Sequence, residues 1–123
     1  MHEMALAEGI LRIIEDQAAA SGFERVRRVR VEVGQLAGVE VEALRFSFDA
    51  VMSNSVADSA VLEIVDTPGQ GWCLDCGTTV GIAALYDACP LCGGYQVHAT
   101  GGMEMRVLDL EVDARAEAPG RPG

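Results

Sequence analysis

The sequence predicts an α+β fold that consists of a small three-stranded sheet, two helices and a cysteine-rich module inserted between two strands of the sheet. Apolar residues recur at helical spacing in two segments and alternate with polar residues in three others. Four cysteines form two close pairs within a glycine-rich stretch. A chain of 123 residues is long enough for one compact domain, or for a core domain with a small appendage.

The first helix is expected from Met4 to Ala20, with Gly22 as its stop. Its apolar positions follow alternating steps of three and four residues, the stripe of an amphipathic helix. They are Met4, Ala7, Leu11, Ile14 and Ala18. A second helix is expected from Val41 to Asn54, because its apolar residues also share one face.

Three strands are expected, each marked by a change to a period of two. In the segment from Arg25 to Gly34, valines at 29, 31 and 33 alternate with charged residues. Residues 60–65 form the second expected strand and residues 108–112 the third. Connections of helix length permit neighbouring or crossed arrangements, so the strand order stays open.

The charge and the basic residues exclude several classes of function. The formal net charge is −10 with a pI near 4.4, and all nine basic residues are arginine. Such a chain repels a phosphate backbone, which argues against nucleic acid as a partner. Without lysine there is no Schiff-base chemistry, and only His2 and His98 could serve as imidazole bases. We therefore expect a protein that is not an enzyme.

The sequence favours a cytoplasmic location. No apolar run approaches the roughly 20 residues that cross a bilayer. The opening Met1-His2-Glu3 is not followed by the basic and apolar regions of a secretory signal. In a reducing compartment, four thiols indicate metal or redox chemistry in preference to disulfides.

The cysteine spacing predicts a structural zinc site. Two CxxC pairs separated by 12 residues offer four thiolates, which complete a tetrahedral shell and leave no open position for catalysis. The ligands are Cys73, Cys76, Cys89 and Cys92. Glycine follows the second cysteine of each pair, at Gly77 and Gly93, and lets the backbone turn back toward the metal.

Three alternatives to zinc remain open from spacing alone: two disulfides, a thioredoxin-like redox pair, or an iron-filled shell of the rubredoxin kind. His98 follows Cys92 by six residues and could replace a thiolate in some state, although a lone histidine there is more often simply exposed. Because the module is too short to bury much apolar area, its folding should depend on the metal.

The N-terminus offers a second metal site. A terminal amine at Met1, the amide nitrogens of His2 and Glu3 and the His2 imidazole can surround one ion in fused rings. A planar nitrogen set of this kind favours Ni(II) or Cu(II) over zinc. On spacing alone, the plainer interpretation is that His2 and Glu3 merely precede a helix.

Taken together, the motifs resemble one family, the HypA-type nickel metallochaperones that serve hydrogenase maturation. The resemblance rests on the opening residues 1–7, on Val31-Glu32-Val33-Gly34-Gln35-Leu36 leading to Gly38-Val39-Glu40, and on the cysteine module followed by Gly102-Met103-Glu104-Met105. Two departures touch no expected ligand. Met4 stands where the family often has leucine, and the tail from Arg115 to Gly123 extends past the usual end.

The resemblance implies that His2, with Met1 and Glu3, binds nickel, and that the four cysteines hold zinc. It also implies delivery to a hydrogenase large-subunit precursor and cooperation with a nickel-binding GTPase of the HypB type. We expect residues 1–70 and 101–114 to form the nickel-binding α+β domain, residues 71–100 a zinc-ribbon-like module, and residues 115–123 a disordered tail.

Two other functions compete with nickel delivery. An acidic zinc-ribbon adaptor would bind proteins without transferring nickel, and a small redox or iron–sulfur carrier would use the same cysteines. The sequence does not indicate whether a hydrogenase or a urease receives the metal, or whether the chain forms a homodimer.

Overall fold

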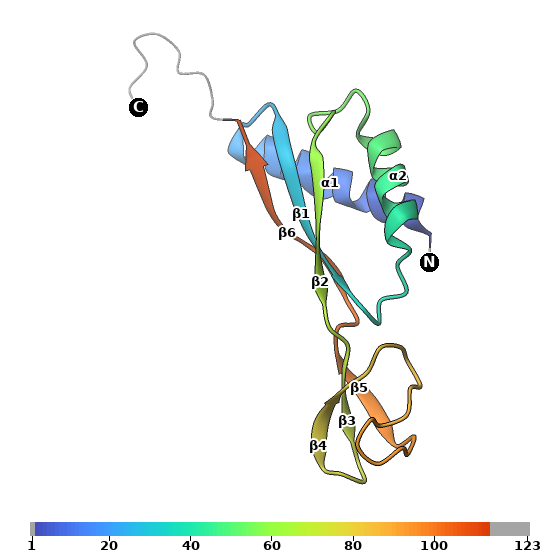
Figure 1. Cartoon of the computed structure of the whole chain (residues 1–123). Coiled ribbons are helices and arrows are strands. Elements are labelled where there is room, and N and C mark those ends of the chain that lie inside the picture. Colours follow the sequence, from blue (N-terminus) through green and yellow to red (C-terminus); the bar gives the residue numbers. More distant parts are fainter. Residues whose placement is uncertain (1, 114–123) are drawn as a thin grey trace, which may run out of the picture. The chain divides into compact units, whose positions relative to one another are not determined.

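A computed structural model describes residues 2–113 of the chain. Met1 and the tail predicted to be disordered lie outside this range. In chain order the elements are α1 (Glu3–Ser21), β1 (Val26–Gly34), α2 (Val41–Met52), β2 (Val61–Thr67), β3 (Gln70–Cys73), β4 (Thr78–Gly81), β5 (Val97–Gly101) and β6 (Met105–Val112) (Figure 1).

The strands form two three-stranded sheets, one ordered β2-β1-β6 and the other β4-β3-β5. The first is the predicted sheet, and the second belongs to the inserted cysteine module, so the α+β class is confirmed. The strand order, left open by the sequence, places β1 in the centre. Strands β3, β4 and β5 were not predicted individually, because they have only four or five residues. In β3 one of the two buried positions is Gly71, which gives no apolar signal.

The chain divides into two compact units, which we call the helical unit and the metal unit. The helical unit contains His2–Val29, Val41–Leu62 and the described residues from Asp109 onward. The metal unit contains Arg30–Glu40 and Glu63–Leu108. The boundaries fall inside β1, β2 and β6, so each of these strands contributes residues to both units.

Helix α1 buries Ala7, Ile10 and Ile14. Two of these lie on the predicted stripe, but Met4 is 45% exposed and Ile10 is buried, so the buried face is rotated from the predicted one. The helix ends as expected at Gly22, whose left-handed φ of 78° lets its N–H donate to the carbonyl of Ala18.

Helix α2 packs against α1 within the helical unit. It buries Leu44, Phe48 and Met52, three residues of its apolar face. The helix ends at Met52 and not at the predicted Asn54, because Asn54 has a left-handed φ of 64° that cannot continue an α-helix.

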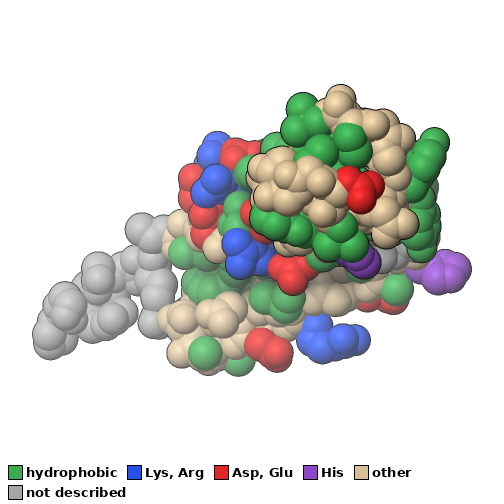
Figure 2. Space-filling view, turned by 90° about the horizontal axis from the view of Figure 1, so that it is seen from below, with side chains coloured by type: hydrophobic (Ala, Val, Ile, Leu, Met, Phe, Trp, Pro, Cys, Tyr) green, Lys and Arg blue, Asp and Glu red, His purple; other side chains and the backbone are tan. Residues whose placement is uncertain are grey.

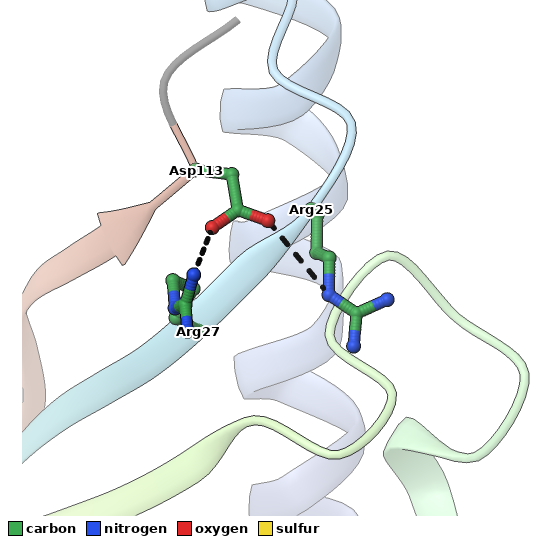
Figure 3. Close-up of polar contacts among 3 residues, drawn as sticks. All are labelled: Arg25, Arg27 and Asp113. Atoms are coloured by element: carbon green, nitrogen blue, oxygen red, sulfur yellow. Dashed lines mark hydrogen bonds and ion pairs between the residues drawn. The ribbon is translucent and has the colours of Figure 1, made fainter.

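Exposed ion pairs join the beginning of β1 to the end of β6. Arg27 donates a hydrogen bond of 2.8 Å to Asp113, and Arg25 forms a longer ion pair of 3.9 Å with the same carboxylate (Figure 3). The backbone N–H of Asp113 also donates to the carbonyl of Arg25. Exposed pairs contribute only about 0–1 kcal/mol each, so we assign them to strand register more than to stability.

Candidate metal centre

The four predicted cysteines lie on two backbone knuckles of the same design. In the first, Gly77 donates its N–H to the carbonyl of Cys73 at 2.8 Å, and in the second Gly93 donates to Cys89 at 2.8 Å. Both glycines have left-handed φ values, 64° and 76°. Each knuckle therefore needs glycine after its second cysteine, which is the role the sequence suggested.

The knuckles bring all four sulfur atoms together. The Sγ atoms of Cys73 and Cys92 are 3.8 Å apart, and those of Cys76 and Cys89 are 3.9 Å apart. All four lie within 4.8 Å of one another. Sulfurs held about 2.3 Å from a zinc ion at tetrahedral corners lie about 3.8 Å apart. The cluster therefore fits a structural zinc site, and all four cysteines are free thiols instead of the alternative disulfides.

Hydrogen bonds shift the pKa values of two of the thiols in opposite directions. Backbone hydrogen bonds from Cys92 and Leu91 lower the pKa of Cys89 to about 7, against the opposing effect of burial. Hydrogen bonding with the thiols of Cys92 and Cys73 raises the pKa of Cys76 to about 12. Four neighbouring thiols do not all ionise without a cation, so metal binding must release protons.

Burial is unequal within the cluster. Cys73 and Cys89 are buried, whereas Cys76 and Cys92 are exposed. The buried pair packs with Leu36, Val80 and Ile82 in the core of the metal unit. Several large apolar side chains of the knuckles and their flanks stay exposed, namely Leu74, Leu85, Tyr86, Leu91 and Tyr95. Figure 2 shows the surface seen from below the view of Figure 1, and its foreground is mostly apolar or uncharged.

His98 is not part of this centre. It lies on β5, where it is exposed and pairs across the sheet with Trp72 of β3. Among the described residues, the cluster of potential ligands that the fold assembles consists of the four cysteines.

The other predicted site lies at the start of α1. His2 is exposed, has an extended backbone (φ −88°, ψ 99°) and caps the helix without a side-chain hydrogen bond to it. Glu3 is the first helical residue. The backbone ladder of α1 begins where Leu6 donates to the carbonyl of His2 at 3.1 Å. The imidazole is therefore not consumed in capping the helix.

Comparison with known proteins now identifies the family. Residues 1–112 match the family model described as "Hydrogenase/urease nickel incorporation, metallochaperone, hypA". The chain belongs to the HypA family. This confirms the resemblance inferred from the motifs.

Relatives in this family cover about nine-tenths of the chain. The hydrogenase maturation factor HypA of Azoarcus sp. (strain BH72) is 61% identical over 110 residues, covering 89% of this chain and 96% of its own length. The same factor of Azotobacter chroococcum mcd 1 is 56% identical over 113 residues, covering 92% of this chain and all of its own.

A solved HypA structure shares the fold. The solution structure of the Ni metallochaperone HypA from Helicobacter pylori aligns with a TM-score of 0.67 at 30% identity, covering 94% of this chain and 100% of that one. Neither α1 nor α2, the helices in the described part of the chain, is long and apolar enough to cross a membrane.

One residue of the metal unit was missed by sequence reasoning about the site. Leu36 was noted only as part of a family motif, yet it lies in the core that surrounds the buried cysteines. The available signal was an apolar residue two positions after the glycine that ends a strand, which by itself does not indicate where the side chain packs.

Proposed function

We propose that the chain is a nickel metallochaperone that binds Ni(II) through Met1, His2 and Glu3 and delivers it during maturation of [NiFe] hydrogenase. The observation that carries the proposal is the match to a nickel-incorporation family over residues 1–112, which includes His2 and all four cysteines. Nickel is cargo in this role, whereas zinc at the cysteine cluster is structural.

The position of His2 suits a transfer site. Its imidazole is exposed just before α1, and the helix ladder begins downstream at the amide of Leu6. A metal held by the amide nitrogens of His2 and Glu3 leaves that ladder intact. Deprotonated amides carry negative charge, which a helix N-terminus stabilises by about 0.3–1 kcal/mol. An open site of this kind can release its ion to a deeper one.

The zinc centre supports a structural and not a catalytic role. Four thiolates fill the tetrahedral shell, so no position remains for water or substrate. We therefore assign no enzymatic reaction to the chain. In the functional division we propose, residues 71–100 form the zinc module, and residues 1–70 with 101–114 form the nickel-binding domain.

The proposed partners follow from the delivery role. They are a nickel GTPase of the HypB type and a hydrogenase large-subunit precursor, both met in the cytoplasm. Exposed apolar side chains on the knuckles, such as Leu74 and Leu91, favour a protein partner at the zinc module. The same side chains also favour a second candidate function, that of an adaptor that binds proteins without transferring nickel.

A nickel competition assay with the untagged protein separates the two candidates. The wild type should bind one nickel ion per chain, and His2→Ala should weaken this binding at least a hundredfold, since one of four nitrogen donors is lost. His98→Ala is the matched control, because it also removes an exposed imidazole. Zinc content and circular dichroism should be the same in all three proteins.

The outcome is decided by the comparison of the two histidine variants. If His2→Ala retains wild-type nickel affinity, the N-terminal site is wrong. If the wild type binds no nickel while its zinc content is normal, the adaptor function is favoured instead.

A further inference from the structure

The metal unit has a second organising centre besides the cysteines, in the three residues Gly34, Gln35 and Leu36 at the end of β1. This segment is hydrogen-bonded to two linkers that lead into and out of the cysteine module. The incoming linker is residues 67–69, from the last residue of β2 to β3, and the outgoing linker is residues 102–104, after β5. All of these residues belong to the metal unit.

The backbone N–H groups of the three residues donate hydrogen bonds alternately to the outgoing and the incoming linker. Gly34 donates its N–H to the carbonyl of Glu104 at 2.8 Å, and Leu36 donates to Gly102 at 2.7 Å. Between them, Gln35 donates to the carbonyl of Thr67 at 2.8 Å. The incoming and outgoing linkers are therefore fixed by successive residues of one strand end.

The side chain of Gln35 adds a bond to the incoming linker. Its Oε1 accepts the N–H of Gly69 at 3.1 Å, and the carbonyl of Gly69 accepts the N–H of Ile82 at 3.1 Å. A Cβ at Gly69 would collide with the carbonyl oxygen of Ile82 and lie 2.8 Å from Cγ of Leu36. The linker thus passes Leu36 in direct contact, without room for a side chain of its own.

The side chain of Leu36 connects this arrangement to the metal ligands. It is 7% exposed and lies in the core cluster with Cys73, Cys89, Val80 and Ile82. Cys73 and Cys89 are the two buried members of the quartet. One residue therefore shares a buried core with two ligands through its side chain and holds the outgoing linker through its backbone.

We propose that Gly34–Leu36 is a coupling clamp, which orders both linkers when the cysteine cluster holds its metal and releases them when the metal leaves. The proposal rests on the zinc assignment made above. Without an ion, only weak backbone hydrogen bonds from Cys76 and Leu91 hold the sulfurs of Cys73 and Cys89 in the core, so the core around Leu36 becomes looser. By linkage, a change that loosens the clamp must also weaken the hold on the metal.

Release of zinc to a chromogenic chelator tests the coupling. Leu36→Ala should release zinc at least about tenfold faster than the wild type, because it removes a side chain from the buried core that contains two ligands. Leu91→Ala is the matched control. The same atoms are removed next to Cys92, but Leu91 is 69% exposed, so its release rate should change less than about twofold.

Two milder variants test the same coupling if the Leu36→Ala protein does not fold. Leu36→Met preserves apolar volume and should release zinc at close to the wild-type rate. Gln35→Ala removes only the acceptor for Gly69, and we expect a severalfold faster release together with faster amide hydrogen exchange at Gly69.

Hydrogen exchange of the full chain, with zinc and after chelation, provides the second measurement. The amides of Gly34, Gln35, Leu36 and Gly69 should lose protection together with those of the knuckles when zinc is removed. The clamp is refuted if Leu36→Ala and Leu91→Ala release zinc at the same rate. It is also refuted if these four amides stay protected while the knuckle amides exchange. A purified protein without zinc would overturn the zinc assignment and the clamp with it, whereas nickel binding at His2 is judged separately.

Discussion

Cys76 and Cys89 belong to different knuckles, and their sulfur atoms lie 3.9 Å apart. The pair Cys73 and Cys92 crosses between the knuckles in the same way, at 3.8 Å. Both of these contacts therefore join the two halves of the module. A metal at the centre would close the 12-residue connection between the pairs, so loss of one ligand should affect both knuckles.

Cys73→Ser should remove zinc and unfold the cysteine module while most of the helical signal persists. Cys73 is a buried ligand, and an incomplete shell loses the binding free energy that also folds the module. Helices α1 and α2 lie in the helical unit and bury their own core. Metal analysis with far-ultraviolet circular dichroism measures both effects. Recovery of paired disulfides and no zinc from the native protein would contradict the prediction.

Gly102→Ala should destabilise the metal unit more than Gly38→Ala. Both glycines have left-handed φ values, 75° and 72°, so each substitution costs about 1–2 kcal/mol in backbone strain. A Cβ at Gly38 meets nothing within 4 Å, whereas one at Gly102 would lie 2.5 Å from the carbonyl oxygen of Pro68. Overpacking of this kind adds about 1–3 kcal/mol. Equal denaturant midpoints for the two variants would show that the linker can move aside.

Glu32 should contribute stability that disappears in acid. A hydrogen bond of 2.7 Å from Arg106, helped by one from Thr67, lowers the pKa of its carboxyl group below the ordinary value. A lowered pKa stabilises the folded state above the unfolded pKa of about 4.3, and the effect is lost as the pH falls through the folded value. The stability difference between wild type and Glu32→Gln should therefore be constant near neutrality and shrink below about pH 4.3. Zinc loss in acid affects both proteins, so the difference isolates Glu32. A difference that does not vary with pH would exclude this role for Glu32.

The sequence predicted those parts of the fold in which one short segment carries the whole signal. The stop at Gly22, the alternating valines of β1 and the two CxxC pairs are all local patterns, and the structure confirms them. The position of Leu36 in one core with Cys73 and Cys89 depends on three distant segments meeting, which no periodicity records. The exposure of Met4 has a similar cause, since the partners of a helix decide which part of its apolar stripe is buried.

Extending the chain by one glycine before Met1 should weaken nickel binding even though every side chain is retained. The extension converts the amine of Met1 into an amide and moves the terminal amine out of the fused chelate rings, so the planar nitrogen set that favours Ni(II) is broken. His2 would still precede α1, and the α1 ladder that begins at Leu6 should form as before. Nickel affinity by competition should therefore fall in the extended protein, while its zinc content and circular dichroism stay at the wild-type level. Acid should release nickel from the unextended protein, because the imidazole and the amine must both be deprotonated to bind.

The control for the extension is a glycine added after Gly123, which should leave nickel affinity unchanged. Wild-type nickel affinity in the chain extended before Met1 would exclude the terminal amine as a ligand and leave the His2 imidazole to be tested alone.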